Sequence, residues 1–260
     1  MENSSRDSRA AFSAQARRFN EYQSNAFKTS FTQEMVNDLC LERSETVLEV
    51  AAGGCALGRV IAPFAARVTE MDVSREMLAP GEAANREGGV RNASYVVGDV
   101  EAMPFPNASF DVAASRLAFH HFPDPEKVMR EMARVLKPGG KAAVMDMVPP
   151  DESARDASDR LERLRDPSHV RCLTPAELTA LAEMAGLRII SSGSETVPLD
   201  PEAWLAPADP DGEARRRIAE AIGTDLGGGP SSGMSPFRDG ERIVLRRRWV
   251  YFIAKKPAAR

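Results

Sequence analysis

The stretch VLEVAAGGCALG, residues 47–58, places the tightest limit on what this chain can fold into. A short apolar run that carries an acid, Glu49, near its end breaks into small residues and glycines before an apolar helical pattern begins. A buried strand, a small-residue turn and a helix in this order open a β-α-β unit. The stretch therefore predicts a parallel sheet with helical crossovers and a ligand at the turn.

Strand and helix patterns alternate along most of the chain. Such an order forces a parallel sheet with right-handed crossovers. We therefore predict a Rossmann-like α/β fold: a doubly wound, mostly parallel, seven-stranded sheet with an antiparallel edge strand. Strands are expected at 46–50, 67–73, 93–100, 110–118, 141–148, 189–197 and 243–256, the last as the closing edge strand, and helices at 31–43, 57–65, 75–88, 125–137, 174–188 and 211–222.

The domain organisation predicted from this pattern is a single domain over 1–260, because no convincing linker divides the chain. Residues 1–44 form an N-terminal helical segment and residues 45–148 the cofactor-binding core. Residues 149–260 supply helices on the substrate side and the last strands. Within them, residues 198–240 are rich in Pro, Gly and Asp, which predicts a lid-like insertion.

Charge and composition argue against several classes of protein. The formal net charge of −4 disfavours nucleic acid as the partner, and the arginine runs 215–217 and 246–248 are expected to be solvated faces. No window approaches the roughly 18 consecutive apolar residues of a membrane helix, and no signal-peptide pattern opens the chain, so we expect a cytoplasmic protein. Cys40, Cys55 and Cys172 are far apart, which fits a reducing compartment and no zinc or disulfide pair.

The turn after the first strand suits two cofactor classes. Dinucleotides and S-adenosylmethionine both bind at a small-residue turn beyond the carboxyl end of a parallel strand. Glu49 would repel the pyrophosphate of a dinucleotide but attract the ammonium and sulfonium of S-adenosylmethionine. The turn also lacks a GxGxxG motif. S-adenosylmethionine, with S-adenosylhomocysteine as its product, is the favoured cofactor, and a dinucleotide-dependent oxidoreductase is the disfavoured alternative.

Residues at the ends of the next two strands fit the rest of that cofactor. Asp72 ends the second strand, where a carboxylate can accept both ribose hydroxyls. Asp99 follows the third strand and can accept an amino proton from adenine, while Met77 and Val100 offer apolar faces to the ring. The structural alternatives are a turn acid for Asp99 and a core position for Met77. Their joint occurrence at successive strand ends favours the cofactor.

Five motifs follow one another between residues 45 and 148: VLEVAAGG, DVSREML, GDVEAMPFPNASFDV, SRLAFHHFPDP and VLKPGG. Together they resemble the class I S-adenosylmethionine-dependent methyltransferases, in particular the type 11, ubiquinone/menaquinone-biosynthesis-like branch. The similarity continues through RLRDPSHVRCLTPAELTALAEMAGL to about residue 190. It implies the Rossmann-like methyltransferase fold with S-adenosylmethionine as the methyl donor.

The resemblance also implies roles for particular positions. Glu49, Ala51 and Gly53 would surround the methionine end of the cofactor. The other implied residues are Asp72, with Val73 beside it, at the ribose and Met77, Asp99 and Val100 at the adenine. Arg116 is a further candidate to contact the cofactor. Tyr22, on the substrate side, is a candidate to fold over the cofactor, with a tyrosine that tethers an N-terminal helix as the alternative.

The turn departs from the pattern of the family at three positions. Many relatives have glycine where this chain has Ala51 and Cys55, and aspartate where it has Glu49. A Cβ at a position of positive φ costs about 1 kcal/mol, so the alanine is a mild change only at negative φ. We expect Cys55 to belong already to the first helical turn, which tolerates a side chain.

Histidines are the candidates for chemistry. The chain has three, His120, His121 and His169, all in segments expected at the open end of the sheet. Imidazole accepts a proton near neutral pH, which suits an acceptor that must be deprotonated as it attacks. The alternative for each is a structural role in shaping its loop. We expect no metal site, because adjacent histidines rarely point at one ion and no HxxE or HExxH spacing accompanies them.

Arginines and the reaction type complete the sequence-based hypothesis. Arg116, Arg165 and Arg171 are candidates to orient an anionic substrate group, with a surface salt bridge as the alternative for each. We predict methyl transfer to a small molecule, such as a quinone, aromatic compound or other metabolite, by in-line displacement in a dry pocket. A non-catalytic protein that binds S-adenosylmethionine is a further alternative.

Overall fold

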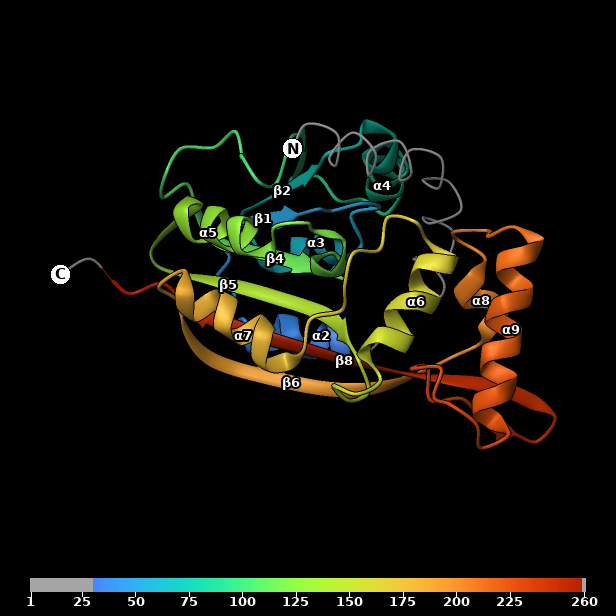
Figure 1. Ribbon diagram of the computed structural model, residues 1–260. Helices are drawn as coiled ribbons and strands as arrows, with labels where there is room; N and C mark the ends of the chain where they lie inside the picture. The colour runs from blue at the N-terminus through green and yellow to red at the C-terminus, as the bar shows by residue number, and fades with distance from the viewer. Residues whose placement is uncertain (1–29, 259–260) are drawn as a thin grey trace.

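The computed structural model describes residues 30–258, and a mostly parallel sheet runs through its centre (Figure 1). The strand order is β3-β2-β1-β4-β5-β8-β6, with β7 paired to β8 off this path. All pairs from β3 to β5 are parallel, and β8 is antiparallel to both of its neighbours. The strands are β1 (Thr46–Val50), β2 (Arg67–Asp72), β3 (Ala93–Val97), β4 (Phe110–Arg116), β5 (Leu136–Val148), β6 (Arg188–Leu199), β7 (Phe237–Asp239) and β8 (Arg242–Lys255).

Helices cover both faces of the sheet, as the predicted doubly wound fold requires. On one face, α5 (Pro125–Val135) and α7 (Pro175–Met184) bury a core against the strands. On the other face, α2 (Ser30–Asp38) and α3 (Ala56–Ile61) bury a second core (Figure 1). Next to α3, α4 (Arg75–Glu87) packs over β2 and β3. None of the helices between residues 30 and 258 is long and apolar enough to cross a membrane.

Two details of the sheet differ from the sequence-based prediction. The strand expected at 243–256 is not the closing edge: β8 lies between β5 and β6, and β6 is the edge strand. The three residues between the helix expected at 125–137 and the strand expected at 141–148 belong instead to β5, which begins at Leu136 directly after α5. A register shift between Phe110 and Val112 of β4 accommodates this early start.

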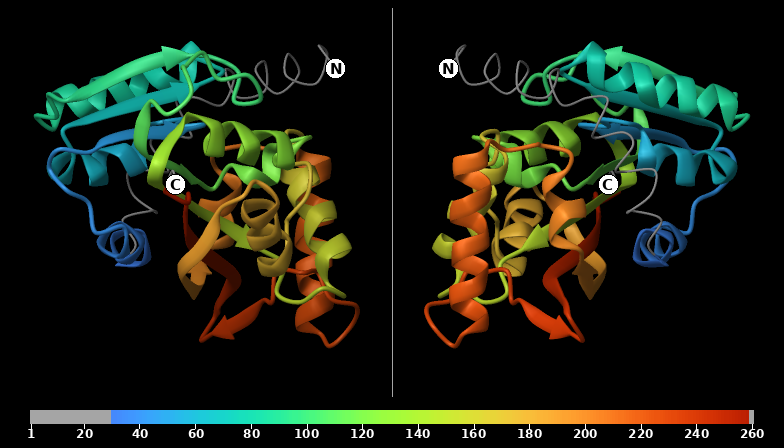
Figure 2. Two further views of the ribbon diagram at one scale, coloured as in Figure 1. Left: turned by 90° about the vertical axis from the view of Figure 1, so that its left-hand side faces the viewer. Right: turned by 90° about the vertical axis from the view of Figure 1, so that its right-hand side faces the viewer.

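A group of helices stands at the end of the sheet where the parallel strands finish. These helices are α6 (Arg155–Arg165), α8 (Pro201–Leu205) and α9 (Gly212–Leu226). Both views in Figure 2 show α9 standing beside α6. Residues 198–240, predicted as a lid-like insertion, therefore contain two helices and β7, and they contribute Trp204 and Ile218 to an apolar cluster with Leu161 of α6.

A buried ion pair fastens α6 to β8. Arg247 is 2% exposed, and its guanidinium lies 3.0 Å from the Glu162 carboxylate and 2.9 Å from Ser158 Oγ. Burial would raise the pKa of Glu162, but the charges of Arg247 and Arg165 lower it to about 2. The expectation that residues 246–248 form a solvated face is thus wrong for Arg247. Side chains point alternately to the two faces of a strand, and the Arg247 side chain points to the buried face.

We expect Arg247→Ala to lower the free energy of unfolding by about 3 to 5 kcal/mol, because it leaves a buried carboxylate without one of its two cations. Urea unfolding of the purified variant measures this change. The matched control is Arg248→Ala, which removes the neighbouring exposed arginine and should change stability by less than about 0.5 kcal/mol. Equal effects of the two substitutions would contradict a structural role for the buried pair.

Candidate active site

The turn between β1 and α3 runs through three residues of left-handed conformation. Ala51, Gly53 and Cys55 have φ of 55°, 50° and 58°. The prediction that Cys55 lies within the first helical turn is therefore wrong, because it is the left-handed residue that precedes α3. Ala51 is likewise not at negative φ. Each Cβ at such a position costs about 1 kcal/mol, so the surrounding packing must hold the turn in place.

Cys55 is held by close packing against α4. Its side chain is fully buried beside Leu78, and a Cβ on Gly81 of α4 would lie 2.6 Å from its Sγ. Only glycine at that position lets the helix approach the turn so closely. Burial, together with the nearby Glu70 and Glu49 carboxyl groups, raises the pKa of the Cys55 thiol well above its usual range. The thiol is consequently inert at neutral pH.

Asp72 ties the turn to the end of β2. Its Oδ2 accepts the N–H of Gly53 at 2.9 Å, and its Oδ1 accepts the N–H of Ser74 at 2.9 Å. Burial raises the pKa of Asp72 to about 6, against the opposing effect of these backbone donors. Each carboxylate oxygen can accept a second hydrogen bond, so the group can still receive hydroxyls from a ligand.

Glu49 lies beneath the start of α3. Its Oε2 accepts the N–H of Gly58 at 2.7 Å, and the side chain is 3% exposed. Arg116, at the end of β4, is buried nearby, and burial lowers the pKa of its guanidinium to about 10 although the charge of Glu49 opposes this effect. The carboxyl group of Glu49 and the buried guanidinium of Arg116 are thus close enough for their charges to interact.

The residues expected around adenine and ribose lie after two neighbouring strands. Asp72 pairs with Val97 in the register of β2 and β3, so the segments that follow them share one edge of the sheet. Met77 is buried and Val73 and Val100 are half-buried. The remaining expected residue of this group, the exposed Asp99, uses Oδ1 to accept the N–H of Glu101 at 2.8 Å. Tyr22 lies outside the described residues.

All three histidines come together at the same end of the sheet. The ring centroids of His120 and His121 are 4.1 Å apart, and His169 lies 5.6 Å from the first and 6.4 Å from the second. The segment that carries His169 is held to the loop after β4 because the N–H groups of Val170 and Arg171 both donate to the His120 carbonyl. The sequence predicted their common location, and the fold brings them into contact.

His120 has the geometry of an oriented acid–base group. Its Nδ1 lies 2.6 Å from Oδ1 of Asp146, near the end of β5. The N–H groups of His120 and Met147 also donate to this carboxylate, at 3.0 and 2.7 Å, which fixes its position. A carboxylate at Nδ1 favours the tautomer with the proton on that nitrogen, so Nε2 carries the lone pair.

The other two histidines have different surroundings. Burial, followed by the charge of His120, lowers the pKa of His121 to about 3, so its ring is neutral; its Nδ1 lies 3.1 Å from the Ser168 carbonyl. The Nε2 of His169 lies 2.7 Å from Oδ1 of Asp159 in α6. Burial alone would raise the pKa of Asp159, but the hydrogen bonds from His169 and from the N–H of Cys172 hold it below its usual range.

His169 belongs to a group of three side chains of the kinds that bind metal ions. Atoms of Asp159, His169 and Cys172 lie within 4.8 Å of one another. The Asp159 Oδ1 already accepts the N–H of Cys172. The Arg247 guanidinium lies 3.9 Å from the Cys172 Sγ. A fixed positive charge beside the sulfur disfavours a bound cation, so we interpret the group as a hydrogen-bonded cluster.

Two of the three arginines predicted to orient a substrate group, Arg165 and Arg171, make contacts within the protein. Arg165 lies 2.7 Å from Glu162 and donates to the Trp204 carbonyl, which links α6 to α8. Arg171 is more exposed and lies 3.4 Å from Glu177. The Arg171 contact matches the surface salt-bridge alternative, whereas the Arg165–Glu162 pair is buried, and the role of either arginine in substrate binding stays a prediction.

Sequence reasoning missed several residues of this site. Asp146 had a usable signal, since it is an acid near the end of an apolar strand, as Glu49 and Asp72 are. Glu70 had the same signal inside β2. Asp159 and the buried arginine of β8 had none, because each depends on the docking of α6 against the end of the sheet.

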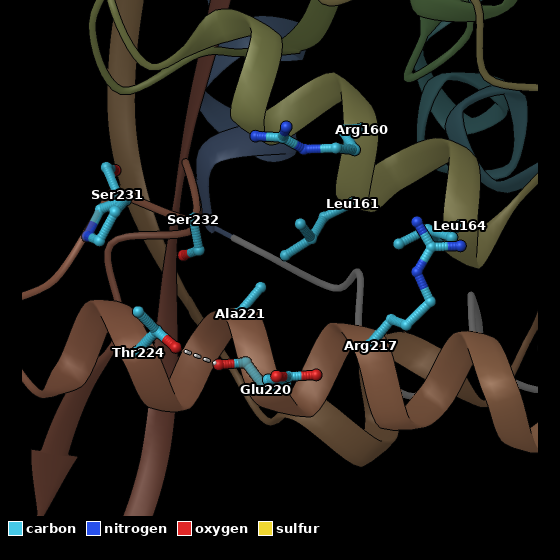
Figure 3. Close-up of a pocket in the computed structure, with 10 residues that line it drawn as sticks. Arg160, Leu161, Leu164, Arg217, Glu220, Ala221, Thr224, Ser231 and Ser232 are labelled. Atoms are coloured by element: carbon cyan, nitrogen blue, oxygen red, sulfur yellow. Dashed lines mark hydrogen bonds between the residues drawn. The ribbon is translucent and has the colours of Figure 1, made fainter.

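A separate pocket of about 300 Å³ lies between α6 and α9 (Figure 3). Leu161 and Leu164 of α6 face Ala221 of α9 across it, with Arg160 and Arg217 at its sides. None of its lining residues belongs to the turn or to the histidine cluster. The pocket is therefore separate from the turn and from the histidine cluster.

Comparison with known proteins agrees with this geometry. Residues 48–144 match the model of a methyltransferase domain. YafE of Escherichia coli K12, an uncharacterized protein, is 34% identical over 60% of this chain and 72% of its own length. The uncharacterized methyltransferase YcgJ of Bacillus subtilis is 33% identical over 63% of this chain and 66% of its own length. The crystal structure of YcgJ superposes with a TM-score of 0.79 over 88% of this chain and 98% of YcgJ, at 25% identity.

The chain belongs to the methyltransferase family whose members share this fold and use a cofactor of the S-adenosylmethionine type. The residues at the turn fit such a cofactor. The buried carboxyl groups of Glu49 and Asp72 suit a cationic ligand with ribose hydroxyls. The half-exposed Ala51 and Val73 border a surface on which it can lie.

We expect the affinity for S-adenosylmethionine to fall as the pH drops below about 6, the pKa of Asp72. Above this pH the group is ionised and accepts hydrogen bonds, and below it the proton occupies an acceptor site. Binding that needs the ionised form would be about tenfold weaker at pH 5 than at pH 7. Calorimetric titration from pH 5 to 7.5 measures this, and Asp72→Asn should lack the acidic limb. A flat profile for the unmodified protein would contradict the assignment.

Proposed function

We propose that this methyltransferase uses S-adenosylmethionine to methylate a small molecule whose hydroxyl proton is taken by His120. The observation that carries the proposal is the pair of His120 with Asp146, whose atoms lie 2.6 Å apart at the carboxyl end of the parallel sheet. The carboxylate has three donors and a fixed position, so it orients the imidazole as a general base. In a protein that only binds the cofactor, the pair would serve to shape the loop after β4.

The proposed cofactor residues follow the order of the strands. Glu49 and Ala51 border the methionine end and Asp72 the ribose, while Met77 and Asp99 border the adenine. These assignments rest on the placement of the residues after β1, β2 and β3 at one edge of the sheet. When bound there, S-adenosylmethionine supplies the methyl group.

The acceptor class we favour is a phenol or a reduced quinone. Relatives whose names state an acceptor include the ubiquinone/menaquinone biosynthesis C-methyltransferase UbiE of Enterobacter sp., 36% identical over 45% of its length. The demethylmenaquinone methyltransferase of Listeria welshimeri is 30% identical over 58% of its length. Removal of a hydroxyl proton raises the electron density of the oxygen and of the ring carbons beside it, so one base serves either O- or C-methylation.

The chain's own residues supply positioning, proton removal and exclusion of water. Nε2 of His120 receives the proton of the acceptor, and Asp146 stabilises the imidazolium that forms. His121 stays neutral and lines the same cluster. We propose that α6, α8 and α9 determine which acceptor enters, because they stand at the end of the sheet where the acceptor must lie (Figure 1). The cytoplasmic location expected from the sequence stays a prediction.

The test of this proposal is His120→Asn, which keeps a hydrogen-bond donor for Asp146 and removes the base. We expect methyl transfer to fall by about 10²- to 10⁴-fold, because that is the usual contribution of a general base. Formation of S-adenosylhomocysteine with a panel of phenols and reduced quinones measures it. The affinity for S-adenosylmethionine, measured by calorimetry, should change by less than about twofold.

Two matched measurements make the outcome interpretable. Asp146→Asn should lower transfer as well and shift its pH profile, because the imidazole loses its orienting charge. Lys127→Gln, at an exposed position of α5, should leave transfer unchanged. Full activity of His120→Asn with an acceptor that the unmodified protein methylates would contradict a role of His120 as the base.

A further inference from the structure

A second carboxyl group, Glu70, lies buried beside Glu49 and has no part in the proposed mechanism. The two residues are register partners on the adjacent parallel strands β1 and β2, so their side chains leave the sheet next to each other. Glu70 is fully buried, and neither of its oxygens has a hydrogen-bond partner. An ionised carboxylate in such a place would lack solvent, and only the Asn85 side chain and the charge of Arg59 would favour it.

Close packing fixes Glu70 beneath the start of α3. A Cβ on Gly58 would lie 2.1 Å from Oε1 of Glu70, so only glycine leaves room for this carboxyl group. The same glycine donates its N–H to Oε2 of Glu49 at 2.7 Å. Both acids therefore contact one residue of the turn region, and neither can move away from the other without disturbing α3.

The charged and titratable groups around Glu70 come from β1, β2, β3, β4 and α3 and from the turn. Burial, and then the charge of Glu49, raises the pKa of Glu70 well above its usual range. Arg59 of α3 and the Asn85 side chain oppose this effect, but the Arg59 guanidinium is already bonded to Asn85 and to the Gly54 carbonyl. The other titratable groups that face the pair are Cys55, Asp72, Tyr95 and Arg116.

We propose that Glu70 is a positioning residue that holds one proton for the carboxyl pair, and that binding of the cationic cofactor at Glu49 drives this proton out. The proposal rests on the proposed binding of S-adenosylmethionine at the turn. Without cofactor the pair carries one negative charge. A cation beside Glu49 offsets that charge, so ionisation of Glu70 costs less in the complex and the proton passes to solvent.

The direction of the pH dependence follows from this linkage. A ligand whose binding releases a proton binds more tightly as the pH rises. The rise due to Glu70 is expected at a higher pH than the titration of Asp72, whose pKa is about 6. Each unit by which binding lowers the pKa of Glu70 contributes up to about a tenfold gain in affinity across the titration. Cys55 and Tyr95 have raised pKa values and stay protonated, so they do not contribute near pH 8.

The experiment compares the unmodified protein with Glu70→Gln, which keeps the shape of the side chain and cannot ionise. Calorimetric titration with S-adenosylmethionine at pH 8, in phosphate and in Tris, gives the number of protons released. We expect the unmodified protein to release a fraction of a proton more than the variant, and its affinity to rise several-fold more between pH 7 and 8.5. Any titration of the cofactor itself is common to both proteins and cancels.

The control is Glu87→Gln, which removes an exposed carboxylate at the end of α4 and should behave as the unmodified protein does. Glu70→Leu is a second variant and should also lose the extra proton. Equal proton release by the unmodified protein and both Glu70 variants would overturn the proposal.

A measurement without ligand separates this proposal from the proposed function. An acid with a raised pKa stabilises the fold below its unfolded value and loses that contribution as the pH rises through its folded value. The melting temperature of Glu70→Gln minus that of the unmodified protein should therefore increase from pH 5 to pH 8.5. A difference in melting temperature that stays constant with pH would contradict the claim that Glu70 holds a proton in the folded protein. Failure of both proteins to bind S-adenosylmethionine would instead defeat the proposed function.

Discussion

The hydrogen bonds between strand-end carboxylates and the backbone of the turn are the contacts on which the site depends. Asp72 of β2 holds the N–H of Gly53, and Glu49 of β1 holds the N–H of Gly58. These bonds keep a left-handed turn in place although Ala51 and Cys55 carry side chains that disfavour it. Because the acids come from adjacent parallel strands, the sheet itself sets the shape of the turn. The same acids give the turn the negative charge that a cationic cofactor needs.

A second pair of contacts holds the histidine cluster. Asp146 of β5 orients His120, and Asp159 of α6 holds His169 against it. The Arg247–Glu162 pair fixes α6 to β8, so it supports the helix whose Asp159 holds His169. The groups proposed to remove a proton come from the loop after β4 and from β5, and α6 supports the neighbouring His169.

Much of the fold was predictable because it depends on local patterns. Alternating strands and helices with a small-residue turn led to the parallel sheet, and the acids at strand ends indicate a candidate cofactor side that stays a prediction. What the sequence did not reveal depends on contacts between distant segments. The left-handed conformation of Cys55 follows from its packing against Gly81, and the partner of His120 is 26 residues away on another strand. The early start of β5 and the interior place of β8 depend on pairing that no local pattern encodes.

The central claim is that this turn holds S-adenosylmethionine and not a dinucleotide. The most direct measurement is calorimetric titration of the purified, cofactor-free protein with S-adenosylmethionine, S-adenosylhomocysteine and NADH in turn. The account predicts binding of the first two at micromolar concentration, on the order of −8 kcal/mol, and none of the third. Binding of NADH, or no binding of either adenosyl compound, would contradict it.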